Sequence, residues 1–450
     1  MDVALKGCFA DPLLEVMNFL NEVMLRYPGV ISFAPGRPAE QHFDVERSLG
    51  KIALYVEHRA RAARASRFSV YTDLGQYSRT NGIIHDLIAR QLEIDEAIRT
   101  PPESIVVTSG CQEGMTILLA ALFDPEADAL LVSDPTYIGI TGIARILGVP
   151  VVPIPAGPQG LDAAAVAAAI DETRRRGLRP RALYEVPDFS NPLGTRTPLA
   201  ARQALLALAR ERELLIFEDN PYGMFEYDGA PLPTLKSLDE PGGQVIYMGS
   251  FSKTLFPGLR LGYLVADQAA VLSDGRRGLL AGELSKIKSL TTINTPPIIQ
   301  AIVGGILLEN GGSLAPLVAG KVPAYRLNRD RMLACLEEEF GAGLPGGGQV
   351  LWNRPSGGFF LTLDLPFEFD QESLETCARD YGVVVCPMTF FALSSGRERQ
   401  VRLAFSYVTP AQIEEGVRRF ARFVRDRAGE VAARPGRLSA VAGSRGGAGG

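Results

Sequence analysis

Residues 249–263, GSFSKTLFPGLRLGY, contain one lysine, Lys253, in a run of apolar and hydroxyl side chains. Lysines usually lie at solvated surfaces among other charges, but here the nearest charged residues along the chain are Glu240 and Arg260. An apolar setting favours the neutral amine, a nucleophile that can form a Schiff base with a carbonyl compound. The segment therefore predicts a reactive lysine.

Two features suit the binding of a phosphate group. The hydroxyls of Ser250 and Ser252 and the guanidinium of Arg260 can donate hydrogen bonds to phosphate oxygens. In SGCQEG, Gly110 comes just before a helix-like run, CQEGMTILLAALF. The free backbone N–H groups at the start of a helix attract anions.

Three further side chains complete a recognisable set. Tyr137 in DPTY offers a flat ring, Asn191 in FSNPLGT an amide, and Asp219 in EDNPY a carboxylate after an apolar strand. Taken singly, each is more often a packing, turn or capping residue. Together, a phosphate cup, an aromatic face, a carboxylate for a ring nitrogen and a Schiff-base lysine describe a site for pyridoxal 5′-phosphate.

The elements that carry these residues are short apolar strands separated by helical segments. This alternation is typical of a mostly parallel sheet that helices cover on both faces. Polar residues cluster just after the strands, at the edge where such sheets bind ligands. The predicted strands are 104–108, 129–133, 182–186, 214–217, 245–248 and 261–265.

The character of the chain changes near Lys321, and the pattern predicts four regions. Residues 61–320 form a large cofactor-binding domain, and residues 321–430 a smaller α+β domain that the N-terminal segment 1–60 joins. The Gly/Ala/Ser-rich residues 431–450 are expected to be a disordered tail.

Composition excludes several classes of function. The 450 residues carry a formal charge of −5 with no basic stripe, so no nucleic-acid partner is expected. The five cysteines lack CxxC spacing and the three histidines are scattered, so neither a disulfide framework nor a metal site is predicted. With no signal-like or membrane-spanning run, we expect no membrane partner and a cytoplasmic location.

The chain resembles the fold-type I pyridoxal-phosphate enzymes, specifically the class I/II aminotransferases that include kynurenine and 2-aminoadipate aminotransferases. The resemblance runs from ISFAPGRPAEQHF near residue 31 to VRLAFSYVTPAQIEEG near residue 402. SFSKTLFPGLRLGY and EDNPYGMFEYDG carry it most specifically, whereas SGCQEG and VPDFSNPLGT are altered forms. It implies an α/β fold, with a mostly parallel seven-stranded sheet in the large domain and a smaller α+β domain.

The resemblance also implies roles for single residues. Lys253 matches the lysine that forms the internal aldimine and moves the proton of a quinonoid intermediate, and Asp219 matches the carboxylate that keeps the pyridine nitrogen protonated. Asn191 and Tyr222 match the pair that contacts the phenolic oxygen, and Tyr137 matches the stacking ring. The phosphate cup corresponds to Gly110, Cys111, Gln112, Ser250, Ser252 and Arg260.

Two matched residues concern the substrate and the partner subunit. Arg402 matches the arginine that grips the substrate α-carboxylate. Tyr77, in LGQYSRTNG, matches a tyrosine that reaches the cofactor phosphate of the neighbouring subunit. The resemblance thus implies a homodimer with shared active sites that acts on a small amino-acid substrate.

Four residues depart from the family pattern. Cys111 replaces a serine, keeping the backbone N–H but losing a hydroxyl, and Asp188 replaces an asparagine, placing negative charge near the cofactor. Arg37 and Arg79 replace smaller residues. Each of these arginines either binds an anionic group of the substrate at the lip of the site or forms a surface ion pair. The lining apolar side chains, with Phe33, Phe189 and Phe359 as candidates, cannot be separated from core by sequence.

Three functions are compatible with these residues. The first is transamination of an α-amino acid. The second keeps the cofactor but ends in β-elimination, decarboxylation or oxidative deamination, as in relatives of specialised biosynthesis that act on cysteine-S-conjugated intermediates. The third is a non-catalytic ligand sensor, which the absence of a DNA-binding segment before residue 31 disfavours.

Overall fold

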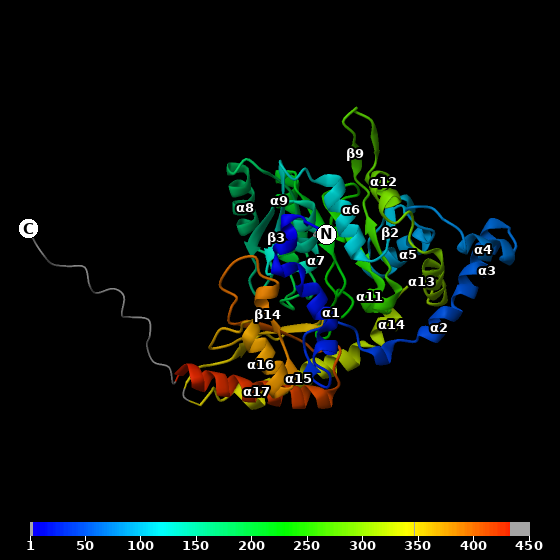
Figure 1. The fold of residues 1–450 in the computed structure, drawn as a ribbon. Helices are drawn as coiled ribbons and strands as arrows, with labels where there is room; N and C mark the ends of the chain where they lie inside the picture. Colours follow the sequence, from blue (N-terminus) through cyan, green and yellow to red (C-terminus); the bar gives the residue numbers. More distant parts are fainter. Residues whose placement is uncertain (1–2, 346, 433–450) are drawn as a thin grey trace, which may run out of the picture.

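The computed structural model describes residues 3–345 and 347–432, so most of the predicted tail, from residue 433 on, lies outside the described residues. The centre of the described chain is a seven-stranded sheet with strand order β2-β8-β7-β6-β5-β3-β4 (Figure 1). Its strands are β2 (Ile105–Thr108), β3 (Asp128–Asp134), β4 (Val151–Pro155), β5 (Arg179–Glu185), β6 (Leu215–Asp219), β7 (Val245–Ser250) and β8 (Gly262–Val265).

The sheet is parallel except for β8, which is antiparallel to both of its neighbours. The mostly parallel α/β sheet predicted from sequence is therefore confirmed. The alternation missed only β4, whose sequence VVPIP contains two prolines. Proline cannot donate to a ladder of hydrogen bonds and is tolerated at a sheet edge, and β4 is an edge strand.

Side chains of successive strand residues enter two separate cores, one on each face of the sheet. On β2, Val106 packs into the core that includes α6 to α9, whereas Ile105 and Val107 pack into the core that includes α3, α5 and α13. These helices are α3 (Ile52–Ala63), α5 (His85–Glu96), α6 (Cys111–Leu122), α7 (Ile138–Leu147), α8 (Ala163–Arg175), α9 (Leu199–Arg212) and α13 (Pro297–Glu309).

A second layer forms below the large sheet in Figure 1. Its four-stranded antiparallel sheet, within the described residues, has the order β11-β12-β15-β14 and packs with three helices. The elements are β11 (Leu351–Trp352), β12 (Phe360–Asp364), β14 (Cys386–Pro387), β15 (Gln400–Ala404), α15 (Val322–Phe340), α16 (Gln371–Tyr381) and α17 (Pro410–Ala432).

The N-terminal segment contacts both layers. β1 (Ile31–Ser32) pairs in parallel with β13 (Val383–Val384), whereas α3 packs on α13 beside the large sheet. The domain boundaries drawn from sequence stay a prediction. None of the described helices is both long and apolar enough to cross a bilayer. The other elements are α1 (Val16–Arg26), α2 (Val45–Gly50), α4 (Arg67–Leu74), α10 (Leu235–Leu238), α11 (Phe251–Thr254), α12 (Leu280–Thr291), α14 (Ala315–Ala319), β9 (Ala269–Val271) and β10 (Arg277–Leu279).

Candidate functional site

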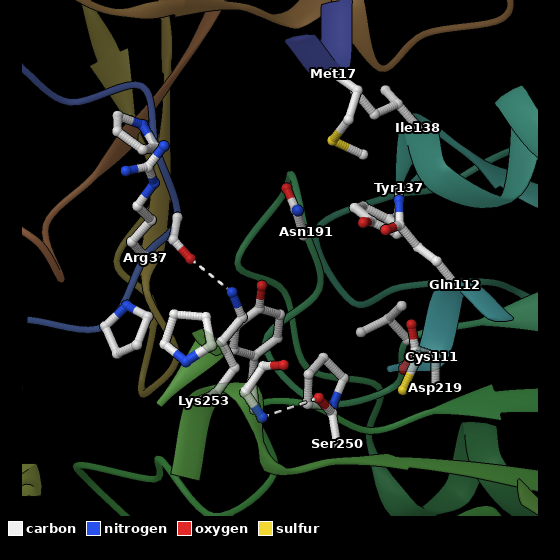
Figure 2. Close-up of a pocket in the computed structure, with 18 of the residues that line it drawn as sticks. Met17, Arg37, Cys111, Gln112, Tyr137, Ile138, Asn191, Asp219, Ser250 and Lys253 are labelled. Atoms are coloured by element: carbon white, nitrogen blue, oxygen red, sulfur yellow. Dashed lines mark hydrogen bonds between the residues drawn. The ribbon is translucent and has the colours of Figure 1, made fainter. Parts of the chain in front are cut away.

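A cavity of about 630 Å³ lies at the carboxyl ends of β5, β6 and β7, between the large sheet and the second layer (Figure 2). Parallel strands bring the residues that follow them to one edge, so distant motifs meet there. Twelve of the residues predicted from sequence line this cavity: Arg37, Cys111, Gln112, Tyr137, Asn191, Asp219, Tyr222, Ser250, Ser252, Lys253, Arg260 and Arg402.

Lys253 lies in the one-turn helix α11 that follows β7, and its amine points into the cavity. Nζ donates a hydrogen bond to the carbonyl oxygen of Gly36 at 2.8 Å. Burial lowers the pKa of Lys253 to about 8, and the nearby charges of Arg402 and Arg260 act in the same direction. A neutral amine is therefore accessible close to neutral pH, as the apolar setting of the lysine predicts.

Asp219 ends β6 and is almost fully buried. Burial raises the pKa of this carboxyl group to about 6, whereas a hydrogen bond from the Tyr184 hydroxyl and the charge of Lys253 lower it. The Tyr184 hydroxyl lies 2.7 Å from Oδ2 of Asp219. A buried carboxylate of this kind can pair with a protonated ring nitrogen.

The turn between β2 and α6 is built to face an anion. Gly110 has φ +80°, a backbone conformation that favours glycine, and a Cβ there would lie 2.6 Å from the guanidinium of Arg260. Gly110 supplies no side-chain cap to the twelve-residue helix α6, which leaves N–H groups of its first turn for a ligand. The helix start and the Arg260 charge therefore converge on one place in the cavity.

The thiol of Cys111, the first residue of α6, does not face the proposed anion. Sγ donates to the carbonyl oxygen of Gly249 at 3.3 Å, and burial raises the pKa of the thiol well above its usual value. The neutral thiol thus packs against β7 and contributes no negative charge. Its backbone N–H remains at the start of the helix, as expected where a cysteine replaces a serine.

Arg402, on β15, brings the second layer into the cavity. Its guanidinium lies between the rings of Phe360 and Phe391, 4.5 and 4.6 Å from their centroids. It donates to Oδ1 of Asn191 at 2.6 Å and to the carbonyl oxygen of Ala34. Its Nε is buried and has no hydrogen-bond partner among the described residues. A buried donor of this kind needs an acceptor, and a ligand carboxylate would supply one.

Two aromatic rings border the same space. Tyr137 is the N-cap residue of α7, and a Cβ at Gly139 would lie 2.3 Å from the Tyr137 ring, so the glycine makes room for it. The ring of Tyr222 lies 5.9 Å from Nζ of Lys253. Burial raises the pKa of each phenol far above the usual value for tyrosine, so both hydroxyls stay neutral and can donate hydrogen bonds.

Tyr77 and Arg79 do not line the cavity of their own chain, as far as the described residues go. Tyr77 is 75% exposed, and Arg79 is exposed as well. Neither residue can therefore act on the site of its own chain in this arrangement. Arg37 does line the cavity.

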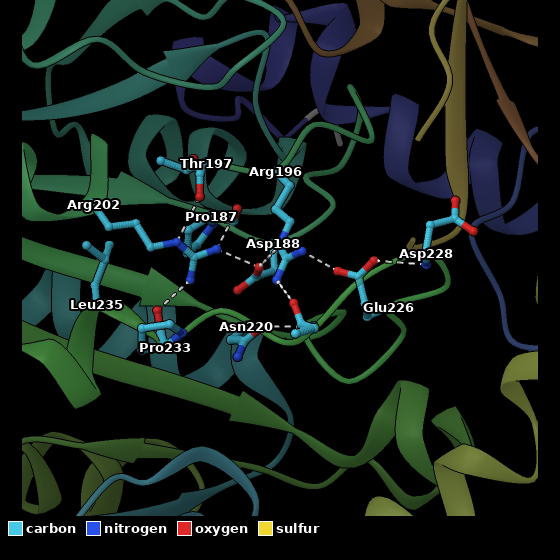
Figure 3. A network of polar contacts seen from close by, with 12 residues as sticks. Pro187, Asp188, Arg196, Thr197, Arg202, Asn220, Glu226, Asp228, Pro233 and Leu235 are labelled. Carbon is cyan, nitrogen blue, oxygen red and sulfur yellow. Dashed lines mark hydrogen bonds and ion pairs between the residues drawn. The ribbon is translucent and has the colours of Figure 1, made fainter. Parts of the chain in front are cut away.

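The expectation that Asp188 places negative charge near the cofactor is wrong. Asp188 is absent from the described residues that line the cavity. The carboxylate is 3% exposed and pairs with the fully buried Arg202 at 2.5 Å and with Arg196 at 3.3 Å (Figure 3). Arg196 in turn pairs with Glu226. Two cations neutralise Asp188, and the network holds the loop that carries Asn191.

The three candidate phenylalanines, Phe33, Phe189 and Phe359, are fully buried core residues and are absent from the described lining of the cavity. Several residues of the site were not predicted from sequence, among them Met17, Gly36, Glu40, Tyr184 and Tyr407. For Tyr184, its place near the end of a predicted strand was the available signal. Gly36, Glu40 and Tyr407 lie in the two segments that bound the family resemblance, which implied no role for them, and no pattern marks Met17.

The residues present fit pyridoxal 5′-phosphate. The free start of α6 with Arg260 suits a phosphate, buried Asp219 suits a pyridine nitrogen, and the Lys253 amine is the only lysine amine among the described lining residues. Known proteins provide an independent comparison.

The family model described as aminotransferase class I and II matches residues 58–420. The chain is 43% identical over 420 residues to (S)-3,5-dihydroxyphenylglycine transaminase of Amycolatopsis orientalis, covering 93% of each chain. It is 32% identical to 2-aminoadipate transaminase of Thermus thermophilus, over 88% of this chain and 90% of that one. The solved kynurenine aminotransferase of Pyrococcus horikoshii superposes with a TM-score of 0.77 at 26% identity, over 95% of each chain. The chain belongs to the class I and II aminotransferases, enzymes that depend on pyridoxal 5′-phosphate and act on amino acids.

Proposed function

We propose that this cavity carries out amino transfer between an α-amino acid and a keto acid, with Lys253, Asp219 and Tyr222 as its catalytic residues. The observation that carries the proposal is the pairing of two groups in one cavity: the Lys253 amine, with a pKa of about 8, and the unpartnered Nε of Arg402. An amino acid has an amine and a carboxylate on one carbon, so it needs both groups close together.

The cofactor would be held by groups whose positions are described above. Asp219 would pair with the ring nitrogen, Tyr137 would cover one face of the ring, and Asn191 and Tyr222 would contact the phenolic oxygen. When bound, pyridoxal 5′-phosphate supplies an electron-withdrawing ring that stabilises negative charge at the substrate Cα. Its phosphate would be held by Gly110, Cys111, Gln112, Ser250, Ser252 and Arg260.

Substrate binding would place the Cα proton within reach of Lys253. Arg402, held by Asn191 and the Ala34 carbonyl, would bind the α-carboxylate, and Lys253 Nζ would take the Cα proton. With a pKa of about 8, Nζ can both accept this proton and release it near neutral pH. Rings of Phe360 and Phe391 on both sides of Arg402 exclude water and strengthen its pairing with a carboxylate.

We also propose a homodimer in which Tyr77 serves the neighbouring subunit's site. The exposed ring of Tyr77 supports this, as do large apolar side chains exposed on adjoining helices. α13 packs against α2, α3 and α4, and Phe68 on α4, Leu290 on α12 and Ile298 on α13 are 81%, 89% and 49% exposed. Apolar surface of this kind is typical of an interface.

The side chain of the substrate is proposed to be aromatic. The relative from Amycolatopsis orientalis, which is named for a dihydroxyphenylglycine, supports this class. The apolar lining residues Met17, Ile138 and Phe391 support it as well. A cytoplasmic location is proposed because the five cysteines are free thiols, as expected in a reducing compartment.

The test is reconstitution of the purified protein with pyridoxal 5′-phosphate. Borohydride reduction should attach the cofactor covalently to the wild type and to Lys286→Ala, which alters an exposed lysine of α12, but not to Lys253→Ala. With an aromatic α-amino acid and a keto acid, the wild type should transfer the amine with ping-pong kinetics. Turnover without a keto acid, with release of ammonia or CO₂, would replace transamination by the elimination, decarboxylation or oxidative branch.

A further inference from the structure

Three polar side chains, Arg37, Glu40 and Tyr407, line one end of the cavity, and the amino-transfer steps do not use them. The Tyr407 hydroxyl donates to Oε1 of Glu40 at 3.2 Å. The Ser406 hydroxyl donates to the backbone carbonyl of Arg37 at 2.6 Å. Although these residues are far apart in sequence, the two hydrogen bonds tie them into one group, here called the polar end.

Arg37 lines the same cavity as the reactive amine and Tyr407, and its charge acts on both. Burial is the main reason that the pKa of Lys253 is lowered, and the Arg37 charge adds to that lowering. Burial likewise raises the pKa of Tyr407, and the Arg37 charge opposes that rise. One cation therefore acts on both groups, and in Figure 2 Arg37 lies across the cavity from Met17 and Ile138.

The backbone of residues 34–37 runs from the carboxylate-binding group to the reactive amine. The Ala34 carbonyl accepts from Arg402, and the Gly36 carbonyl accepts from Lys253. Arg37 is the next residue beyond the amine. A substrate held by its carboxylate at Arg402 and by its amine beside Lys253 would extend its side chain into the rest of the cavity, which the polar end and the facing wall line.

The facing wall is apolar. It includes Met17 from α1 and Ile138 from α7, which lie across the cavity from Arg37 (Figure 2). Methionine sulfur makes favourable contacts with an aromatic ring. A side chain in this space thus meets apolar groups on one side and polar groups on the other.

We propose that the polar end selects amino acids whose aromatic side chain carries a hydroxyl group, an assignment that rests on the proposed amino transfer. A hydroxyl both donates and accepts, so Arg37 can donate to it while Glu40 or Tyr407 accepts from it. A side-chain carboxylate would be attracted by Arg37 but repelled by Glu40. An unsubstituted ring would displace water from these polar groups and offer no hydrogen bond in return, which costs binding energy.

The test compares phenylglycine with 4-hydroxyphenylglycine and 3,5-dihydroxyphenylglycine, which differ only in ring hydroxyls. The measurement is the rate of the first half-reaction without keto acid, monitored through the absorbance of the bound cofactor. We expect the hydroxylated compounds to react with a second-order constant at least about 10-fold higher, the effect of one hydrogen bond to a charged group. Arg37→Met, which keeps the apolar stem, should collapse that ratio towards one, and Tyr407→Phe should reduce it in part.

The matched control is Arg379→Met, which removes an exposed arginine of α16 that pairs with Asp380; its ratio should equal that of the wild type. Equal rates for phenylglycine and its hydroxylated forms in the wild type would overturn the inference, as would an Arg37→Met variant that slows all three compounds alike. Faster reaction with 2-aminoadipate than with any aromatic compound would also overturn it. Failure of the proposed amino transfer would give a different result. The first half-reactions would be normal, but no amine would pass to a keto acid.

Discussion

Asp219 shows how a single buried residue is balanced between two charge states. Loss of water raises its pKa to about 6, and the Tyr184 hydroxyl opposes that rise by donating a hydrogen bond to the charged form. Together with the charge of Lys253, this tyrosine favours the ionised form, although it does not line the cavity among the described residues. Tyr184 is thus a positioning residue, acting through Asp219.

Tyr184→Phe should move the acid limb of kcat/KM to higher pH. The carboxylate is ionised only above its pKa, and losing the donor raises that pKa further above about 6. A hydrogen bond to a charged group is worth about 1.5–3 kcal/mol, so a shift of about one pH unit is expected. The measurement is a pH profile of kcat/KM, in which the loss at pH 6 exceeds the loss at pH 8.

Tyr381→Phe is the control for that profile, because its hydroxyl donates to Asp426 at the surface of the second layer, 2.8 Å away. Its profile should match the wild type. If Tyr184→Phe lowers activity equally at every pH, the hydroxyl does not tune Asp219.

At the scale of elements, the start of α6 depends on α12. Glu113 of α6 accepts from the backbone N–H of Ser109 at 2.6 Å, which holds the turn before the helix. Lys288 of α12 donates to both oxygens of Glu113, at 3.0 and 2.9 Å, and its side chain is fully buried. One ion pair thus joins the proposed phosphate-binding turn to a helix that does not line the cavity, as far as the described residues show.

Glu113→Gln should lower the free energy of unfolding by about 3 kcal/mol, because it leaves the buried ammonium of Lys288 without a counter-charge. Urea unfolding of the cofactor-free protein measures the change. The double variant Glu113→Gln/Lys288→Met removes both charges and should regain most of the loss. A double variant as unstable as the sum of the two single variants would show that the two side chains are not coupled.

At the scale of the whole molecule, the active site of one subunit is expected to be completed by the other. Tyr77 is 75% exposed in the single chain and lies outside the described lining of its own cavity, whereas most of the residues it would join line that cavity. A shared site can be tested with two different defects placed on two chains, because each chain can supply what the other lacks.

Tyr77→Ala and Lys253→Ala chains should each be impaired alone, and co-expression should restore activity. A mixed dimer has one site with Lys253 from the first chain and Tyr77 from the second, so about half of the sites in the co-purified mixed dimers should be intact. The assay is amino transfer by co-purified, differently tagged chains. A mixture no more active than its two components would refute a site shared through Tyr77.

Much of this protein could be predicted from sequence, because some of its features are local. The run around Lys253, the glycine before α6 and the carboxylate ending β6 each have a physical meaning that depends only on near neighbours. Alternation of apolar strands and helices then places such residues at one edge of a parallel sheet. The cofactor and the fold class follow from these features.

The tertiary structure alone decided which charges reach the cavity. Asp188 and Arg37 are both unusual charged residues beside recognisable motifs, but Asp188 meets the buried Arg202 and is neutralised, whereas Arg37 enters the cavity. Tyr407 and Glu40 meet only because the second layer folds back on the N-terminal segment. Electrostatic effects depend on distance through space and on burial, and neither can be read from spacing along the chain.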